Sequence, residues 1–129
     1  MLGIMADNDV TGQFRVLLRI LRDEPRRVLW ESLHVKVYRF AVVGLRRDSR
    51  DIEVWKLCQE RQIVLVTGNR NSAESHSLEM AIRTLNTPES LPVFTISAPR
   101  QIRETEYAER VADRLMEYIA DIENLRGTG

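Results

Sequence analysis

The chain has little of what marks secreted, membrane-spanning or disordered proteins. Its single cysteine, Cys58, excludes an internal disulfide and a cysteine-based zinc site. No apolar stretch approaches the roughly 20 residues that span a bilayer. The first ten residues lack both a basic leader and a long apolar run, so no signal peptide is expected. With only four prolines and six glycines, the chain is not of low complexity, and the expected compartment is the cytoplasm.

Net charge is also lacking, because 19 basic residues balance 19 acidic ones. A balanced charge gives no long-range attraction for nucleic acid, which counts against a dedicated DNA-binding protein. It leaves room for an enzyme that meets RNA through a local basic patch. A length of 129 residues and a 43% hydrophobic composition suit one domain, spanning residues 1–129, with a buried core.

Short apolar runs alternate along the chain with helical stripes. Strands are expected at 2–6, 37–43, 63–66 and 93–96, and helices at 10–21, 26–33, from 51 onward, 72–85 and about 104–124. The helix at 26–33 is expected to bury Val28, Leu29 and Leu33. Strands separated by helical connections predict an α/β fold, a three-layer α/β/α sandwich around a mostly parallel sheet of about four strands.

The last helix carries an apolar stripe made of Tyr107, Val111, Leu115, Ile119 and Ile122. The stripe packs either on the sheet or on a second copy of the chain, and the sequence does not separate these alternatives. The tail 126–129 is expected to be mobile.

Polar residues gather where the expected strands end. They are Asp7, Asn8 and Asp9 after the first strand, Asp51 after the second, and Thr67, Asn69, Arg70, Asn71 and Glu74 at and after the third. In open parallel sheets, ligands bind outside the carboxyl ends of the strands. Carboxylates that converge there repel one another unless a cation neutralises them, and hard oxygen ligands suit Mg²⁺ or Mn²⁺. Asp7, Asp9 and Asp51 are therefore candidate metal ligands, at a site suited to phosphodiester hydrolysis.

Several of these residues also have ordinary structural roles. Asp9 is expected to cap the first helix and Asp51 the third, while Asn71 and Glu74 have the spacing of a capping box. Gly68 is expected to supply a backbone angle that a larger residue resists. Arginines in the loop before Asp51 are either phosphate contacts or solvated side chains; they are Arg46, Arg47 and Arg50.

Four stretches, in this order, carry a resemblance to a known family. They are MADNDV (5–10), GLRRDSRDIEVWKLCQ (44–59), IVLVTGNRN (63–71) and SLEMAIRTLNTPESLPVFTI (77–96). A strand ending in Asp, a Gly-Leu loop leading to Asp at a helix start, and an apolar strand ending in Thr-x-Asx together resemble PIN-like domain proteins. The chain looks closest to a small bacterial group of PIN-like proteins related to the Mut7-C and DUF5615 families.

The resemblance implies a three-layer PIN-like fold and a Mg²⁺ or Mn²⁺ site that cuts RNA. Asp7 would match the acid that ends the first strand, and Asp51 the acid that opens the middle helix. Asn69 stands where catalytic members usually have an aspartate, and a neutral amide binds a divalent ion less strongly. The missing charge would come from Asp9, Glu74 or Glu79.

Two functions follow as expectations. The first is a metal-dependent ribonuclease, for example the toxin of a toxin–antitoxin pair, with RNA as substrate and a small antitoxin-like protein as partner. Asp7, Asp51 and Asn69 would be its catalytic residues; replacing Asp7 with Asn would abolish cleavage and leave thermal stability nearly unchanged. The alternative is a non-catalytic PIN-like module that binds RNA, a nucleotide or a protein. The balanced charge and the amide-rich TGNRN loop favour this alternative. A homodimer is expected by resemblance.

Overall fold

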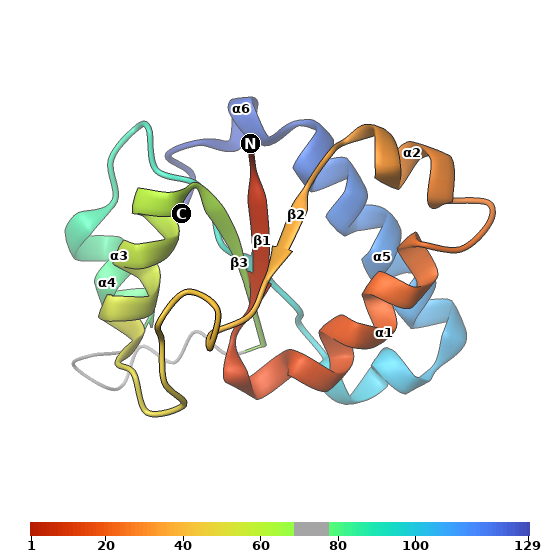
Figure 1. The fold of residues 1–129 in the computed structure, drawn as a ribbon, viewed down its shortest axis with the longest axis horizontal. Helices are drawn as coiled ribbons and strands as arrows, with labels where there is room; N and C mark the ends of the chain where they lie inside the picture. The colour runs from red at the N-terminus through yellow and green to blue at the C-terminus, as the bar shows by residue number, and fades with distance from the viewer. Residues whose placement is uncertain (69–77) are drawn as a thin grey trace.

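The computed structural model describes residues 1–68 and 78–129 and shows an α/β fold (Figure 1). A four-stranded, all-parallel sheet has the order β2-β1-β3-β4, formed by Lys36–Tyr38, Gly3–Ala6, Ile63–Thr67 and Phe94–Thr95. The helices are α1 (Thr11–Leu21), α2 (Arg27–Ser32), α3 (Asp51–Arg61), α4 (Leu78–Leu85), α5 (Thr105–Ala120) and α6 (Ile122–Leu125), with short 3₁₀ turns η1 (Asn8–Val10) and η2 (Pro99–Arg103).

Helices cover both faces of the sheet, as predicted. On one side α1, α2 and α5 pack over β1 and β3, and on the other side α3 and α4 pack over the same strands (Figure 1). Every residue of β1 and β3 is buried. This explains why both strands read as uniformly apolar runs, since a strand covered on both faces has no polar side.

The apolar spacing of α1 places four buried side chains along one stripe, namely Phe14, Leu17, Leu18 and Leu21. The same face of the sheet also receives the stripe of the last helix, of which Leu115, Ile119 and Ile122 are buried and Tyr107 and Val111 are partly buried. The stripe therefore packs within the chain, against α1 and the sheet. Within the described residues, no helix is long and apolar enough to cross a membrane.

The strand expected at 37–43 is wrong beyond Tyr38. The chain turns instead, with the Val43 amide bonded to the Phe40 carbonyl at 3.2 Å and the Leu45 amide to the same carbonyl at 2.9 Å. Because β2 is an edge strand whose partner β1 ends at Ala6, which lies opposite Arg39 in this register, a strand that continued to residue 43 would have no neighbour to pair with. Gly44, at φ +83°, completes the turn in a conformation that favours glycine.

Two helices also differ from expectation. In α2 the side chains of Val28 and Leu29 are 67% and 54% exposed, while Trp30 is buried and anchors the helix. The long last helix is broken into α5 and α6 at Asp121, whose amide still bonds the Glu117 carbonyl. The first part of the helix expected at 72–85 lies outside the described residues.

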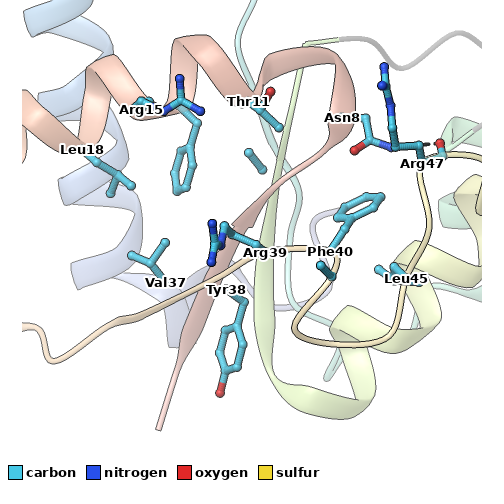
Figure 2. Close-up of a pocket in the computed structure, with 13 residues that line it drawn as sticks. Asn8, Thr11, Arg15, Leu18, Val37, Tyr38, Arg39, Phe40, Leu45 and Arg47 are labelled. Carbon is cyan, nitrogen blue, oxygen red and sulfur yellow. Dashed lines mark hydrogen bonds between the residues drawn. The ribbon is translucent and has the colours of Figure 1, made fainter.

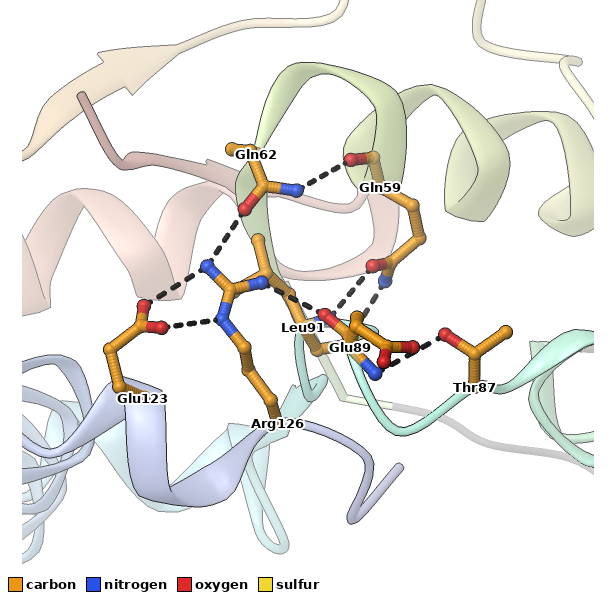
Figure 3. A network of polar contacts seen from close by, with 7 residues as sticks. All are labelled: Gln59, Gln62, Thr87, Glu89, Leu91, Glu123 and Arg126. Carbon is orange, nitrogen blue, oxygen red and sulfur yellow. Dashed lines mark hydrogen bonds and ion pairs between the residues drawn. The ribbon is translucent and has the colours of Figure 1, made fainter.

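The C-terminal residues are tied to the body of the fold. Arg126 pairs with Glu123 at 2.9 Å and donates to the side chain of Gln62 at 2.8 Å and to the carbonyl of Glu89 at 2.9 Å (Figure 3). The Gly127 amide donates to the Ser90 carbonyl at 2.8 Å. The prediction of a mobile tail at 126–129 does not account for these contacts.

Candidate functional site

The polar residues after β1 and β3 meet at the point where the chain changes sides of the sheet. The connection that leaves β1 begins with α1 on one face, whereas α4, the next helix after β3, lies on the opposite face. Such a switch point opens a crevice at the carboxyl ends of the strands. Asp7 and Thr67 stand at this point, and the Thr67 hydroxyl lies 3.5 Å from Oδ2 of Asp7.

Asp7 is held in place by the backbone around it. Its amide donates to the Val66 carbonyl at 2.8 Å, which continues the pairing of β1 with β3 by one residue. Its Oδ1 accepts the Asn8 amide at 2.8 Å and so caps the short turn η1. The position of this carboxylate therefore follows from the two central strands.

Asp9 does not have the capping role expected from the sequence. The residue at the start of α1 is Val10, which makes no side-chain cap. The Asp9 carboxylate instead accepts the backbone N–H of Gly68 across the switch point. Asp9 lies within the turn η1, one residue before the N-cap position of α1, which is why the predicted cap does not form.

Position 68 requires glycine because there is no room for a side chain, and not because of its backbone angle. A Cβ atom at this position would stand 2.7 Å from both Pro99 Cγ and Val10 Cγ1, closer than real side chains approach. Its backbone is not in the left-handed region, so the expectation of an unusual angle is wrong. The absence of a side chain lets the end of β3 lie against η1 and η2.

Asp51 opens α3, as expected, but does not cap it. The residue before α3 is Arg50, and no side chain caps the helix there. The Asp51 carboxylate accepts the amide of Leu78, the first residue of α4, at 3.0 Å. It therefore connects α3 to α4, the helix that follows β3. Because the two residues are 27 positions apart, local sequence spacing does not reveal this contact.

Burial and neighbouring charge both raise the pKa of the carboxyl groups. The pKa of Asp7 is raised from 3.8 to about 6, first by loss of solvent and then by the charges of Asp9 and Asp51, while hydrogen bonds from Asn8 and Thr67 oppose the rise. The pKa of Asp9 is also raised, first by loss of solvent and then by the charge of Asp51, against the hydrogen bond from Gly68. The crevice thus brings three carboxylates close enough for their charges to act on one another.

Asn8 links this acidic crevice to the basic loop 39–50. Its side-chain amide donates to the Arg47 carbonyl at 2.9 Å. In this loop Arg46 pairs with Asp48, and Arg50 with Glu53, as exposed ion pairs. The structure thus places the backbone of Arg47 beside the site.

Of the remaining predicted site residues, Asn69, Arg70, Asn71 and Glu74 lie outside the described residues. Glu79 is part of α4, where it pairs with Arg83 at 3.8 Å. Across residues 1–68 and 78–129, no group of three or more His, Cys, Asp or Glu side chains has the spacing to hold a metal ion.

A pocket of about 460 Å³, which the sequence did not suggest, adjoins the crevice at Asn8 (Figure 2). One wall comes from α1 and the other from β2 and the loop that follows it. Its lining includes Phe14, Tyr38, Phe40, Arg15, Arg39 and Arg47. The aromatic and basic residues at 38–40 are the signal for this pocket in the sequence, but their strand propensity led to the prediction of a strand.

Together these features define a doubly wound, parallel α/β protein with an acidic crevice at its switch point. No family model matches the chain, and comparison with curated proteins and with solved structures finds no similar protein. The resemblance to PIN-like domains stays a prediction.

Proposed function

We propose that this protein is a Mg²⁺- or Mn²⁺-dependent ribonuclease of the PIN-like kind, whose reaction centre is the crevice of Asp7, Asp9 and Asp51. The observation that carries the proposal is the electrostatic one. Asp7 lies at the switch point with its pKa raised to about 6, first by burial and then by the charges of Asp9 and Asp51. Sites that hold such unfavourable charge are often functional.

The donor set fits a hard divalent cation. Carboxylate oxygens from the end of β1 and the start of α3 are the ligands that Mg²⁺ and Mn²⁺ prefer. Asp7 and Asp9 would hold the ion, with Asp51 as the third acid. A bound ion supplies an activated water and stabilises charge on the phosphoryl group. A complete centre needs Asp51 to leave the Leu78 amide or a further ligand to join, because the described acids do not form a ready group of three.

The other residues position these acids and the substrate. Thr67 and Gly68 hold Asp7 and Asp9 by hydrogen bonds. Asn8 anchors the backbone of Arg47, whose guanidinium would contact a phosphate of the RNA strand. Phosphate contacts of this kind fix the register of a strand without reading its sequence.

The test is cleavage of a labelled single-stranded RNA with Mn²⁺, compared with the same reaction in EDTA. We expect Asp7→Asn to lower the cleavage rate by more than about 100-fold, because it removes a metal ligand. Replacing a residue that only orients a ligand typically costs about 10- to 100-fold. Glu117→Gln, an equivalent change on the exposed surface of α5, is the control and leaves the rate unchanged. Cleavage that persists in Asp7→Asn would refute the assignment.

The second candidate is a non-catalytic PIN-like module that binds RNA, a nucleotide or a protein. Two observations favour it: the Asp51 carboxylate is already engaged by the Leu78 amide, and no described group of three acids is spaced for a metal. RNA binding with no cleavage in Mn²⁺, equal in the wild type and Asp7→Asn, would select this function over the first.

A further inference from the structure

The pocket beside the crevice has walls of two kinds. Its inner surface is apolar, with Phe14 and Leu18 from α1 facing Val37 from β2 and Phe40 from the following turn. Phe14 and Leu18 are buried, and Phe40 is partly buried. A volume of about 460 Å³ lies within the range of small-molecule sites, roughly 300–1,000 Å³.

Three arginines stand at the rim. In Figure 2 Arg15 and Arg39 lie toward one end of the pocket, and Arg47 lies toward the other end with Asn8 and Phe40. All three arginine side chains are exposed, and within residues 1–68 and 78–129 none of them forms an ion pair. Guanidinium groups without carboxylate partners are suited to bind phosphate through paired hydrogen bonds.

A ligand for this pocket needs a flat apolar part and an anionic part. A fatty acid would match the apolar walls but has no flat ring to stack on the aromatic side chains. A nucleotide matches both, because its base stacks on aromatic rings and its phosphate meets guanidinium groups. The end of the pocket at Asn8 and Arg47 adjoins the acidic crevice, so a phosphate there would lie on the side of Asp7.

We infer that this pocket binds a nucleoside monophosphate unit, with the base against Phe14 and Phe40 and the phosphate at the end lined by Asn8 and Arg47. The inference deepens the proposed function by naming what is recognised next to the crevice. It rests on that function only for the source of the nucleotide, a strand of RNA. A free nucleotide has the same chemistry, and the experiment separates the two sources.

The first measurement is calorimetric titration with adenosine 5′-monophosphate in EDTA. We expect binding with a Kd at or below about 1 mM, and weaker binding of adenosine, which lacks the phosphate. Asp7→Asn should bind at least as well as the wild type, because the variant removes a negative charge beside the phosphate. Nucleotide binding in EDTA can therefore be found even if the protein does not cleave RNA, and cleavage can be found even if the free nucleotide does not bind.

Variants of the pocket test its two walls separately. Phe40→Leu keeps an apolar side chain but removes the ring, and we expect binding at least about fivefold weaker. The double variant Arg39→Gln with Arg47→Gln should weaken binding by at least about tenfold. Its matched control is the double variant Arg19→Gln with Arg22→Gln, which changes the net charge equally. Arg19 lies in α1 and Arg22 directly follows it; both are exposed, and neither lines the pocket. Unchanged melting temperatures show that the variants fold.

A trinucleotide of adenosine identifies the source. Binding at least about tenfold tighter than the monophosphate, and weakened by the same variants, would indicate a strand; equal affinity would indicate a free nucleotide. The inference is overturned if the monophosphate does not bind at 10 mM, if adenosine binds equally well, or if the pocket variants behave as the control does.

Discussion

Replacing Asp7 with Asn should stabilise the protein in the absence of divalent cations. The wild-type carboxylate is partly buried beside two other acids, and its pKa is raised from 3.8 to about 6. Asparagine has nearly the same shape, and its oxygen can still accept the Asn8 amide while its amide group donates to the Thr67 hydroxyl. The substitution thus removes the charge and keeps the contacts. This differs from the expectation, based on sequence alone, that stability would hardly change.

The magnitude follows from proton linkage. A rise in pKa from 3.8 to about 6 corresponds to about 3 kcal/mol of unfavourable free energy once the group is ionised. Because the carboxyl group is only partly buried, solvent screens some of this effect, and we expect about 2 kcal/mol. The cost is absent below pH 3.8, grows as the pH rises toward 6, and is complete above that value, because the folded state holds the proton more tightly than the unfolded state.

The assay is urea unfolding of the wild type and Asp7→Asn between pH 3.5 and pH 8, in EDTA. The two proteins should be equally stable near pH 3.5, and the variant should gain about 2 kcal/mol by pH 7, equivalent to roughly 5–10 °C in Tm. Adding Mn²⁺ should then stabilise the wild type alone, by about 2.7 kcal/mol at 100 times Kd. Glu117→Gln is the control for loss of one exposed charge. A variant that is less stable than the wild type at pH 7, or a difference that does not depend on pH, would refute the reasoning.

Three further predictions concern stability and reactivity. Gly68→Ala should cost roughly 1–3 kcal/mol in urea unfolding, because its Cβ would overlap two side chains, whereas Gly12→Ala, with open space around it in α1, should be neutral or stabilising. Arg26→Met should lower the free energy of unfolding by about 1 kcal/mol at pH 7 in the same assay, because it removes the ion pair with Asp113. Since Arg26 lowers the pKa of Asp113, the loss should shrink when the pH falls below 3.8. A loss that stays constant with pH would contradict the assignment. Cys58 is buried with a pKa raised to about 12, so native protein should resist alkylation by iodoacetamide at pH 8, and rapid labelling seen by mass spectrometry would show that the core opens.

The sequence was sufficient to predict the centre of the fold. The strands β1 and β3 are buried on both faces, so their apolar runs allow only one interpretation, and Asp7 and Thr67 necessarily lie where those runs end. The helices α1 and α3 followed from apolar spacing and from the polar residues around them. These features depend on neighbours in the chain.

The features that were missed depend on contacts between distant segments. The bond between Asp51 and the Leu78 amide spans 27 residues, and the reason for Gly68 lies in Val10 and Pro99. The apolar run after Tyr38 has high strand propensity, but it extends past the end of its only partner strand. Propensity describes a residue, whereas pairing requires a neighbour.

The C-terminal contacts have a practical consequence for labelling and fusion. Met1 precedes β1, and Arg126 bonds Gln62, which precedes β3, so both ends of the described chain lie at the amino edge of the sheet (Figure 1). The acidic crevice and the pocket beside Asn8 lie at the opposite edge. An affinity tag or fluorophore on either end would thus lie away from the crevice and the pocket. Of the two ends, the amino end is the better point of attachment, because Met1 is 90% exposed. Near the other end the chain is packed closely: a Cβ atom added at Gly127 would lie 3.0 Å from the backbone of Pro88.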